Sequence, residues 1–191
     1  MLKKYLSAEK LSQWHQLVDE AKNVVLIGHA SPDGDAMGSA LAMCHYLKFL
    51  GKQAVVVMPN AFPDFLNWLP GAEMVVNALY KRGTAQKLFA QADLLLCLDF
   101  SGKERLEEIS VWLDWYQQNR VILDHHLNPE MNASLLISDP EASSTSEIVY
   151  CLLNQLGYYK DMSKECAMCI YCGMMTDTGG FTYASSRPEI Y

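Results

Sequence analysis

Short apolar runs alternate with longer amphipathic stretches along almost the whole chain. A few apolar residues bounded by glycine, proline or polar residues are typical of a buried strand, and apolar residues three and four positions apart are typical of a helix. Strands are predicted at residues 23–28, 54–58, 94–98, 121–123 and 134–137. Helices are predicted at residues 7–22, 35–50, 62–69, 79–90, 103–118, 143–156 and 163–175. This alternation predicts an α/β fold with a mostly parallel central sheet and helices on both faces.

Four of the apolar runs are followed by acidic or histidine residues. These residues are His29, Asp33 and Asp35, then Asp99, then Asp124, His125 and His126, and finally Asp177. The carboxyl ends of parallel strands meet at one edge of a sheet, where open α/β proteins collect their sites. We therefore expect these side chains to converge, and so many carboxylates in one cleft require cations.

Composition limits the class of protein. The chain has 191 residues, 50% of them hydrophobic, which suits one globular domain. The net charge of −7 argues against coating of long nucleic acid through a basic face, but bound cations would still allow a short phosphorylated substrate. No apolar run reaches the ~18 residues of a membrane span, and the first residues lack the apolar stretch of a signal peptide. We expect a cytoplasmic protein with no membrane partner.

Six cysteines occur, three of them spaced as Cys166-x-x-Cys169-x-x-Cys172. An iron–sulfur cluster is one interpretation of this spacing. However, the three positions fall on a predicted amphipathic helix among apolar residues, and no fourth cysteine follows. We favour a packed helix face, and we expect Cys44 and Cys97 to be buried small side chains as well.

The stretch from His29 to Asp35 fits a loop between a strand and a helix. In such a loop His29 and Asp33 can fold back toward one ion, while Asp35 reaches a second ion beside it. Gly34 permits a tight backbone and Pro32 stiffens it. A helix N-cap is the alternative for either aspartate, but it leaves the histidine unexplained.

Two adjacent histidines follow Asp124. Neighbouring residues of an extended strand point to opposite sides, so one of His125 and His126 can bind a metal while the other faces the substrate. Asp124 is placed to hold an imidazole tautomer from behind. Asp99 in isolation is better explained as a cap or turn residue, and Asp177 can belong to a helix C-cap and still be a ligand. The accompanying clusters make us interpret both as metal ligands.

The mixture of ligand types indicates the chemistry. Oxygen-rich sets with some imidazole favour Mn²⁺ or Mg²⁺ over a structural zinc site. Two such ions ~3.5–4 Å apart can activate a water and stabilise an in-line displacement at phosphorus. The residue types alone therefore predict metal-dependent hydrolysis of a phosphoester or a phosphoanhydride.

Arg105, Ser144 and Thr145 are candidates for substrate binding. A helix that begins with several hydroxyl groups could face phosphate. Ser144 and Glu147 also have the spacing of a capping box, which is a sufficient explanation by itself. Arg105 could bind phosphate or could be a solvated charge on a helix.

Taken in order, these motifs resemble those of the DHH phosphoesterase superfamily, whose catalytic domain is Rossmann-like. The motifs are Gly28-His29-x-x-Pro32-Asp33-Gly34-Asp35-Ala36-x-Gly38-Ser39, Asp99, Asp124-His125-His126, Ser144-Thr145 and Thr176-Asp177-Thr178-Gly179. The match runs from about residue 23 to residue 182. The first motif most resembles the bacterial nano-RNase/pAp-phosphatase branch, and differs from the RecJ exonucleases and the manganese-dependent pyrophosphatases.

The resemblance implies a role for each residue. Two Mn²⁺ ions would be bound, one by His29 and Asp33, the other by Asp35, His125 and Asp177, with Asp99 bridging them. His126 would face the scissile phosphate and Asp124 would orient the histidines, so that His126, Asp99 and Asp124 form the catalytic set. The attacking group would be a metal-activated water, with no covalent enzyme intermediate.

The resemblance also implies an activity. Members of this branch trim very short RNAs to mononucleotides and remove a phosphate from 3′-phosphoadenosine 5′-phosphate (pAp), and we expect both substrates here. The alternatives are an exopolyphosphatase or pyrophosphatase, a RecJ-like single-strand exonuclease, and a non-catalytic nucleotide-binding module. A homodimer is left open.

Proteins of this branch carry a second, nucleotide-gripping domain called DHHA1. We expect residues 1–191 to be the DHH catalytic domain and a DHHA1 domain to follow residue 191. The start of a helix predicted by the spacing of Ser186 and Glu189 supports this expectation. Without the second domain, the chain should bind Mn²⁺ but turn over nucleotides poorly.

Overall fold

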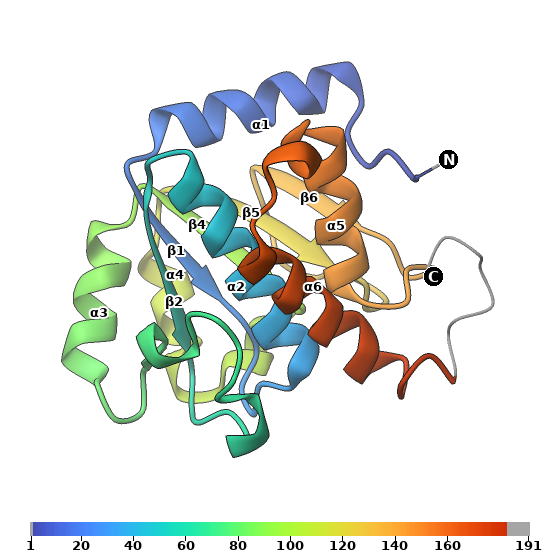
Figure 1. Ribbon diagram of the computed structural model, residues 1–191. Coiled ribbons are helices and arrows are strands. Elements are labelled where there is room, and N and C mark those ends of the chain that lie inside the picture. Colours follow the sequence, from blue (N-terminus) through green and yellow to red (C-terminus); the bar gives the residue numbers. More distant parts are fainter. Residues whose placement is uncertain (1, 183–191) are drawn as a thin grey trace.

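A parallel sheet of six strands in the order β3-β2-β1-β4-β5-β6 organises the molecule (Figure 1). The computed structural model describes residues 2–182. The strands are β1 (Asn23–Ile27), β2 (Gln53–Met58), β3 (Val76–Asn77), β4 (Leu94–Leu98), β5 (Asn119–Asp124) and β6 (Leu135–Ser138). The strand order reverses between β1 and β4, which pair directly. The predicted α/β fold is confirmed, and such a reversal is where open parallel sheets bind ligands.

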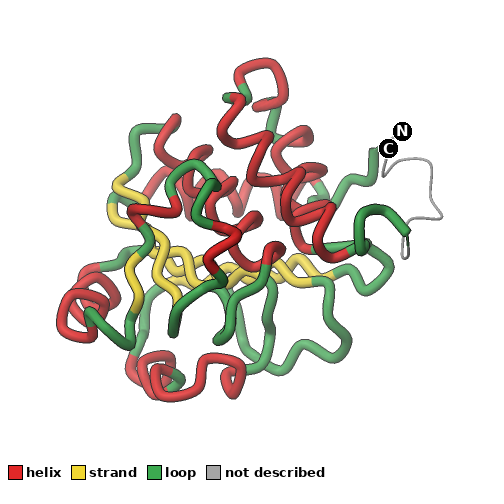
Figure 2. Tube along the Cα trace, turned by 60° about the horizontal axis from the view of Figure 1, so that its bottom comes forward, coloured by secondary structure: helices red, strands yellow, loops and turns green. Residues whose placement is uncertain are grey.

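Helices cover both faces of the sheet (Figure 2). One layer contains α1 (Ala8–Glu20), α2 (Gly34–Phe49), α5 (Thr145–Gln155) and α6 (Lys164–Asp177). The other contains α3 (Arg82–Gln91), the 3-10 helix η3 (Lys103–Ile109) and α4 (Val111–Trp115). Alternate residues of β1 serve the two layers, because Val24 and Leu26 join the first core and Val25 and Ile27 the second. Within residues 2–182, every helix is too short or too polar to cross a membrane.

The helix predicted at residues 103–118 is broken in the structure. It consists of η3 and α4, and Glu107 inside η3 has a positive φ of 50°. In a continuous helix the carbonyl of Arg105 would accept from the amide four residues later. It accepts instead from the backbone N–H of Ala30, at 2.7 Å. A contact with a distant loop therefore overrides the local helical pattern.

The segment between β2 and α3 also differs from the prediction. The helix expected at 62–69 is reduced to the short 3-10 helix η1 (Asp64–Leu66), because Pro70 has no N–H to donate to the carbonyl of Leu66 and disfavours helical backbone at Leu69. Two further 3-10 helices are present, η2 (Ala72–Met74) after it and η4 (Tyr158–Asp161) between α5 and α6. Strand β3 was not predicted, since two residues are too few to show a period.

Helices α2 and α6 lie side by side (Figure 1) and approach closely. A methyl group added at Gly38 would lie 2.5 Å from the carbonyl oxygen of Cys169. The thiol of Cys166 donates to the carbonyl of Ala42 at 3.4 Å, and burial raises its pKa to about 12. Cys166, Cys169 and Cys172 are all buried and free, which confirms the packed helix face.

Gly38→Ala should lower the free energy of unfolding by about 1–3 kcal/mol, because the new methyl group would press on the backbone of α6. Gly83→Ala in α3 is the matched control, since nothing lies within 4 Å of its added methyl group. That control should leave stability unchanged or raise it by up to ~1 kcal/mol. Chemical denaturation measures both variants, and wild-type stability of Gly38→Ala would contradict the close approach.

Candidate metal centre

The acidic and histidine residues gather at the carboxyl edge of the sheet, around the reversal between β1 and β4. Strands β1, β4 and β5 contribute residues at their ends, as do the N-terminus of α2 and the C-terminus of α6. The side chains brought together are His29, Asp33, Asp35, Asp99, Asp124, His125, His126 and Asp177. The structure thus assembles every residue that the sequence placed at the metal centre.

Two backbone carbonyls determine which ring nitrogen of His29 and His125 is available. Nδ1 of His29 donates to the carbonyl of Ala30 at 2.8 Å, and Nδ1 of His125 donates to the carbonyl of Ala142 at 3.4 Å. A carbonyl oxygen can only accept, so Nδ1 carries the proton in both rings. In the neutral ring this leaves the lone pair on Nε2, the usual arrangement for a metal-binding imidazole.

Asp99 is buried between these two imidazoles and faces both. Its Oδ2 lies 3.4 Å from Nε2 of His29, and its Oδ1 lies 3.6 Å from Nε2 of His125. The hydroxyl of Thr145 donates to Oδ1 at 2.9 Å, and the backbone N–H of Asp99 donates to the carbonyl of Leu123 at 3.0 Å. The φ angle of Asp99 is +67°, a conformation that costs energy for any residue with a side chain. The fold therefore holds this carboxylate in a strained but fixed orientation.

Asp33 combines two functions that the sequence left as alternatives. Its Oδ1 caps α2 by accepting from the backbone N–H groups of Asp35 and Ala36, at 2.9 and 3.0 Å. Its Oδ2 lies 3.8 Å from Nε2 of His29. The N-cap is thus confirmed, and one oxygen remains free to bind an ion.

Asp35 is fully buried and points at the N-terminus of α5. It accepts from the backbone N–H groups of Thr145 and Ser146 at 2.6 and 2.9 Å, where the helix dipole favours a negative charge. Even so, burial and repulsion from Asp99 and Asp177 raise the pKa of Asp35 well above its usual range. A bound cation would relieve this repulsion.

Three groups of residues offer ligand atoms that lie within 4.8 Å of one another. The groups are His29, Asp33 and Asp99; Asp35, His125 and Asp177; and Asp99, His125 and His126. Asp99 belongs to two of these groups and contacts His125 of the third. Carboxylate oxygens and imidazole nitrogens without thiolates suit Mn²⁺ or Mg²⁺, so the residues present fit a pair of such ions.

His126 is oriented differently from the other two histidines. Its Nδ1 donates to Oδ1 of the fully buried Asp124 at 2.8 Å. This hydrogen bond raises the pKa of His126, whose side chain is 47% exposed. A half-exposed ring held through Nδ1 presents its Nε2 to solvent or to a substrate, while Asp124 fixes the direction.

Ser144 and Thr145 are fully buried, in contrast to the substrate contacts expected for them. Ser144 caps α5 by accepting from the backbone N–H of Glu147 at 3.0 Å, and Glu147 accepts from the N–H of Ser143 at 2.7 Å. The predicted capping box is therefore present, except that Glu147 accepts from the N–H of Ser143 and not from that of the N-cap residue Ser144. The hydroxyl of Thr145 is directed at Asp99, which favours a supporting role behind the site, and substrate contact by these two residues stays a prediction.

The loop that carries His29 is held from two sides by groups that the sequence did not single out. The side chain of Asn60 accepts from the N–H of Ser31 at 2.6 Å, where Ser31 has a positive φ of 53°. On the other side, the carbonyl of Arg105 accepts from Ala30. Asn60 follows the apolar run of β2, just as the acidic residues follow theirs, and this signal could have identified it.

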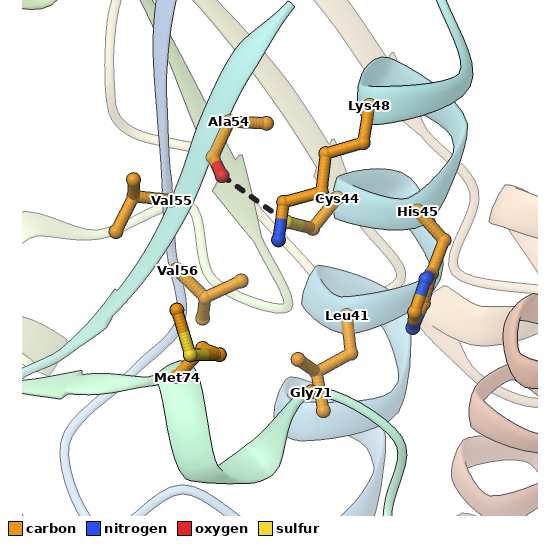
Figure 3. Close-up of a pocket in the computed structure, with 9 residues that line it drawn as sticks. All are labelled: Leu41, Cys44, His45, Lys48, Ala54, Val55, Val56, Gly71 and Met74. Atoms are coloured by element: carbon orange, nitrogen blue, oxygen red, sulfur yellow. Dashed lines mark hydrogen bonds between the residues drawn. The ribbon is translucent and has the colours of Figure 1, made fainter.

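A separate cavity of about 200 Å³ lies between α2, β2 and η2 (Figure 3). Its walls include the apolar side chains of Leu41, Val56 and Met74, together with His45 and Lys48. Among the described residues no carboxylate lines it, and none of the residues of the metal centre does.

The fold and the donor set together define a class: an α/β protein with acidic and histidine side chains that could bind metal ions at the carboxyl edge of its sheet. Comparison with family models gives the particular family. Residues 23–174 match the model of the DHH family, N-terminal domain, and the chain belongs to this family.

Individual relatives agree with this assignment. The chain is 31% identical over 167 residues to the bifunctional oligoribonuclease and PAP phosphatase NrnA of Thermus thermophilus, covering 87% of this chain and 47% of that protein. It is 44% identical to the crystal structure of an exopolyphosphatase-related protein from Bacteroides fragilis, with a TM-score of 0.96 over 100% of this chain and 56% of that one. The exonuclease RecJ bound to manganese shares the fold, at 15% identity and a TM-score of 0.50 over 88% of this chain and 44% of that one. The chain thus spans about half the length of the curated relatives it matches.

Removal of divalent cations should change how stability depends on pH. Burial, together with neighbouring carboxylates, raises the pKa values of Asp35 and Asp177. The metal-free folded protein therefore binds more protons than the unfolded chain above about pH 4, and its melting temperature should fall as the pH rises through the raised pKa values of these two carboxyl groups. Saturating Mn²⁺ should add about 3 kcal/mol and remove this slope. Thermal melts in EDTA and in Mn²⁺ measure both, and an identical slope in the two conditions would count against a cation site.

Thr145→Val removes the hydroxyl that donates to Asp99 and preserves the shape of the side chain. The affinity for Mn²⁺ should fall about 10- to 100-fold, as is usual when a metal ligand loses its supporting partner. Calorimetric titration measures the affinity, and Thr84→Val on the exposed surface of α3 is the matched control. Equal affinities of the two variants would show that this hydrogen bond does not position Asp99.

Proposed function

We propose that this chain is the catalytic domain of a metal-dependent phosphoesterase that hydrolyses short oligoribonucleotides to mononucleotides and removes the 3′-phosphate of pAp. The observation that carries the proposal is the position of Asp99, whose two oxygens face the imidazoles of His29 and His125 in separate donor groups. The choice of substrates is supported by the similarity to NrnA of Thermus thermophilus, whose name states both activities.

The donor groups indicate how two ions would be shared. One Mn²⁺ would be held by His29, Asp33 and Asp99, and the other by Asp35, His125, Asp177 and Asp99. Mg²⁺ would suit the same oxygen-rich set. When bound, such ions activate a water and stabilise the negative charge that develops on the phosphoryl oxygens.

The remaining chemistry falls to His126 and Asp124. Asp124 accepts from Nδ1 of His126, and this hydrogen bond would hold the imidazole with Nε2 toward the scissile phosphate. The raised pKa keeps this ring protonated to a higher pH. Nε2 can then donate a hydrogen bond to a phosphoryl oxygen, or a proton to the leaving oxygen.

We extend the proposal to the rest of the protein and to its location. A DHHA1 substrate-binding domain would follow residue 191, in keeping with a chain that covers 47% of its Thermus relative. The helix start predicted at Ser186 to Glu189 lies outside the residues that the structure describes. The six cysteines all lie within residues 2–182 and form no disulfide there, which is typical of a reducing compartment and supports a cytoplasmic location.

A second candidate is hydrolysis of phosphoanhydrides such as polyphosphate. It is favoured by the 44% identity to the exopolyphosphatase-related protein from Bacteroides fragilis. The same pair of cations could serve either reaction. Dependence on a nucleoside distinguishes the two, because an oligoribonuclease should prefer RNAs of about two to five residues to polyphosphate.

The test compares a 5′-labelled RNA dinucleotide, pAp and polyphosphate, each with Mn²⁺ and with EDTA. Asp99→Ala should reduce Mn²⁺-dependent turnover about a thousand-fold, because loss of the shared carboxylate removes several kcal/mol of charge stabilisation. Asp114→Ala is the matched control, since Asp114 is an exposed carboxylate paired with Lys103.

The outcomes separate the candidates. Release of mononucleotide and AMP, lost in Asp99→Ala alone, supports the main proposal. Cleavage of polyphosphate only would assign the second candidate. No cleavage by the longest natural reading frame that contains this chain would overturn both.

A further inference from the structure

Arg105 differs from the other arginines of residues 2–182. Arg82 pairs with Glu108 and lies over the ring of Trp112, and Arg120 donates to two backbone carbonyls. Within that part of the chain the guanidinium of Arg105 forms neither a hydrogen bond nor an ion pair, and its side chain is exposed. Because residues 2–182 leave this cation unpaired, it is available to an anion.

Arg105 and His126 line the same cavity, whose volume is about 290 Å³. One wall is formed by Phe100, Ser101, Gly102, Glu104 and Arg105, which follow β4. Lys103 does not line the cavity. The other wall lies within residues 126–130, which follow β5. The unpaired guanidinium therefore shares a small space with the imidazole proposed to face the scissile phosphate.

Backbone hydrogen bonds fix this cavity to the metal centre. The carbonyl of Ser101 in one wall accepts from the N–H groups of Glu130 and Met131 at 3.1 and 2.9 Å. The carbonyl of Arg105 accepts from Ala30 at 2.7 Å, in the loop that carries the first histidine. The distance from the base of the Arg105 side chain to the proposed ligands is thus set by the backbone.

The lining of the cavity suits a nucleotide better than polyphosphate. Arg105 can pair with a phosphate through two parallel hydrogen bonds. Glu104 and Glu130 lie in the same lining and can accept from ribose hydroxyls, and the exposed side chain of Leu127 can pack against a sugar or a base. The same two carboxylates would repel a polyphosphate chain, in which every unit is charged.

We propose that this cavity is a subsite for the phosphate of the nucleotide that is not cleaved, with Arg105 as its binding residue. The inference rests on the proposed function and deepens it. In pAp the 3′-phosphate would lie at the metal centre and the 5′-phosphate at Arg105. A 5′-phosphorylated dinucleotide would be bound in the same way, which explains how one site accepts both substrates.

The test measures KM for pAp and for adenosine 3′-monophosphate, which lacks the second phosphate, in the longest natural reading frame that contains this chain. Arg105→Gln should raise KM for pAp about 10- to 100-fold, as expected for loss of a charge-assisted phosphate contact, and change KM for the monophosphate less than about 2-fold. Arg105→Lys should recover part of the loss. Lys103→Gln is the matched control, because it removes a positive charge two residues away that does not line the cavity.

Several outcomes would overturn the subsite. An equal rise in KM for both substrates would place Arg105 at the scissile phosphate. An equal effect of Lys103→Gln on KM would show that Arg105 contributes only through its charge and not through a specific phosphate contact. If the wild-type protein hydrolyses neither compound, the proposed function fails. The subsite is then tested separately by calorimetric measurement of the affinities for pAp and for the monophosphate. A loss of affinity in Arg105→Gln for pAp but not for the monophosphate would support it, and equal affinities would not.

Discussion

Repulsion between buried carboxylates is the constraint on which the rest of this structure depends. Asp35, Asp99 and Asp177 approach one another at the carboxyl edge of the sheet, and the pKa of Asp35 is raised well above its usual range as a result of burial and of this repulsion. The N-terminus of α5 and the hydroxyl of Thr145 offset part of the unfavourable energy. Divalent cations would supply the remaining compensation, and this is the physical basis of the metal centre that we propose.

The architecture delivers these groups to one place. Reversal of the strand order sets β1 beside β4, which brings His29 next to Asp99. The close approach of α2 and α6 at Gly38 brings the first turn of α2 near the end of α6 and Asp177. At this edge Ser31 and Asp99 have positive φ angles, which are unfavourable in free energy for residues with a side chain. The surrounding structure must therefore hold the backbone in these conformations. The candidate metal centre therefore lowers the free energy of unfolding of the metal-free protein.

Much of this could be predicted from the sequence, because burial imposes its pattern locally. The apolar runs identified every strand except the two-residue β3, and the acidic and histidine residues that follow β1, β4, β5 and the apolar stretch of α6 predicted the cluster that the structure brings together. What the sequence could not show depends on contacts between distant segments. The break at Glu107 follows from the bond between Arg105 and Ala30, and the partnership of Thr145 with Asp99 joins residues that are far apart in the chain. No local period contains that information.

The most direct test of the central claim is anomalous X-ray diffraction from crystals grown with Mn²⁺, recorded on both sides of the manganese absorption edge. The account predicts two anomalous peaks ~3.5–4 Å apart, the separation typical of paired catalytic ions, with the carboxylate of Asp99 in contact with both. A single peak, or two peaks that do not share Asp99, would contradict it.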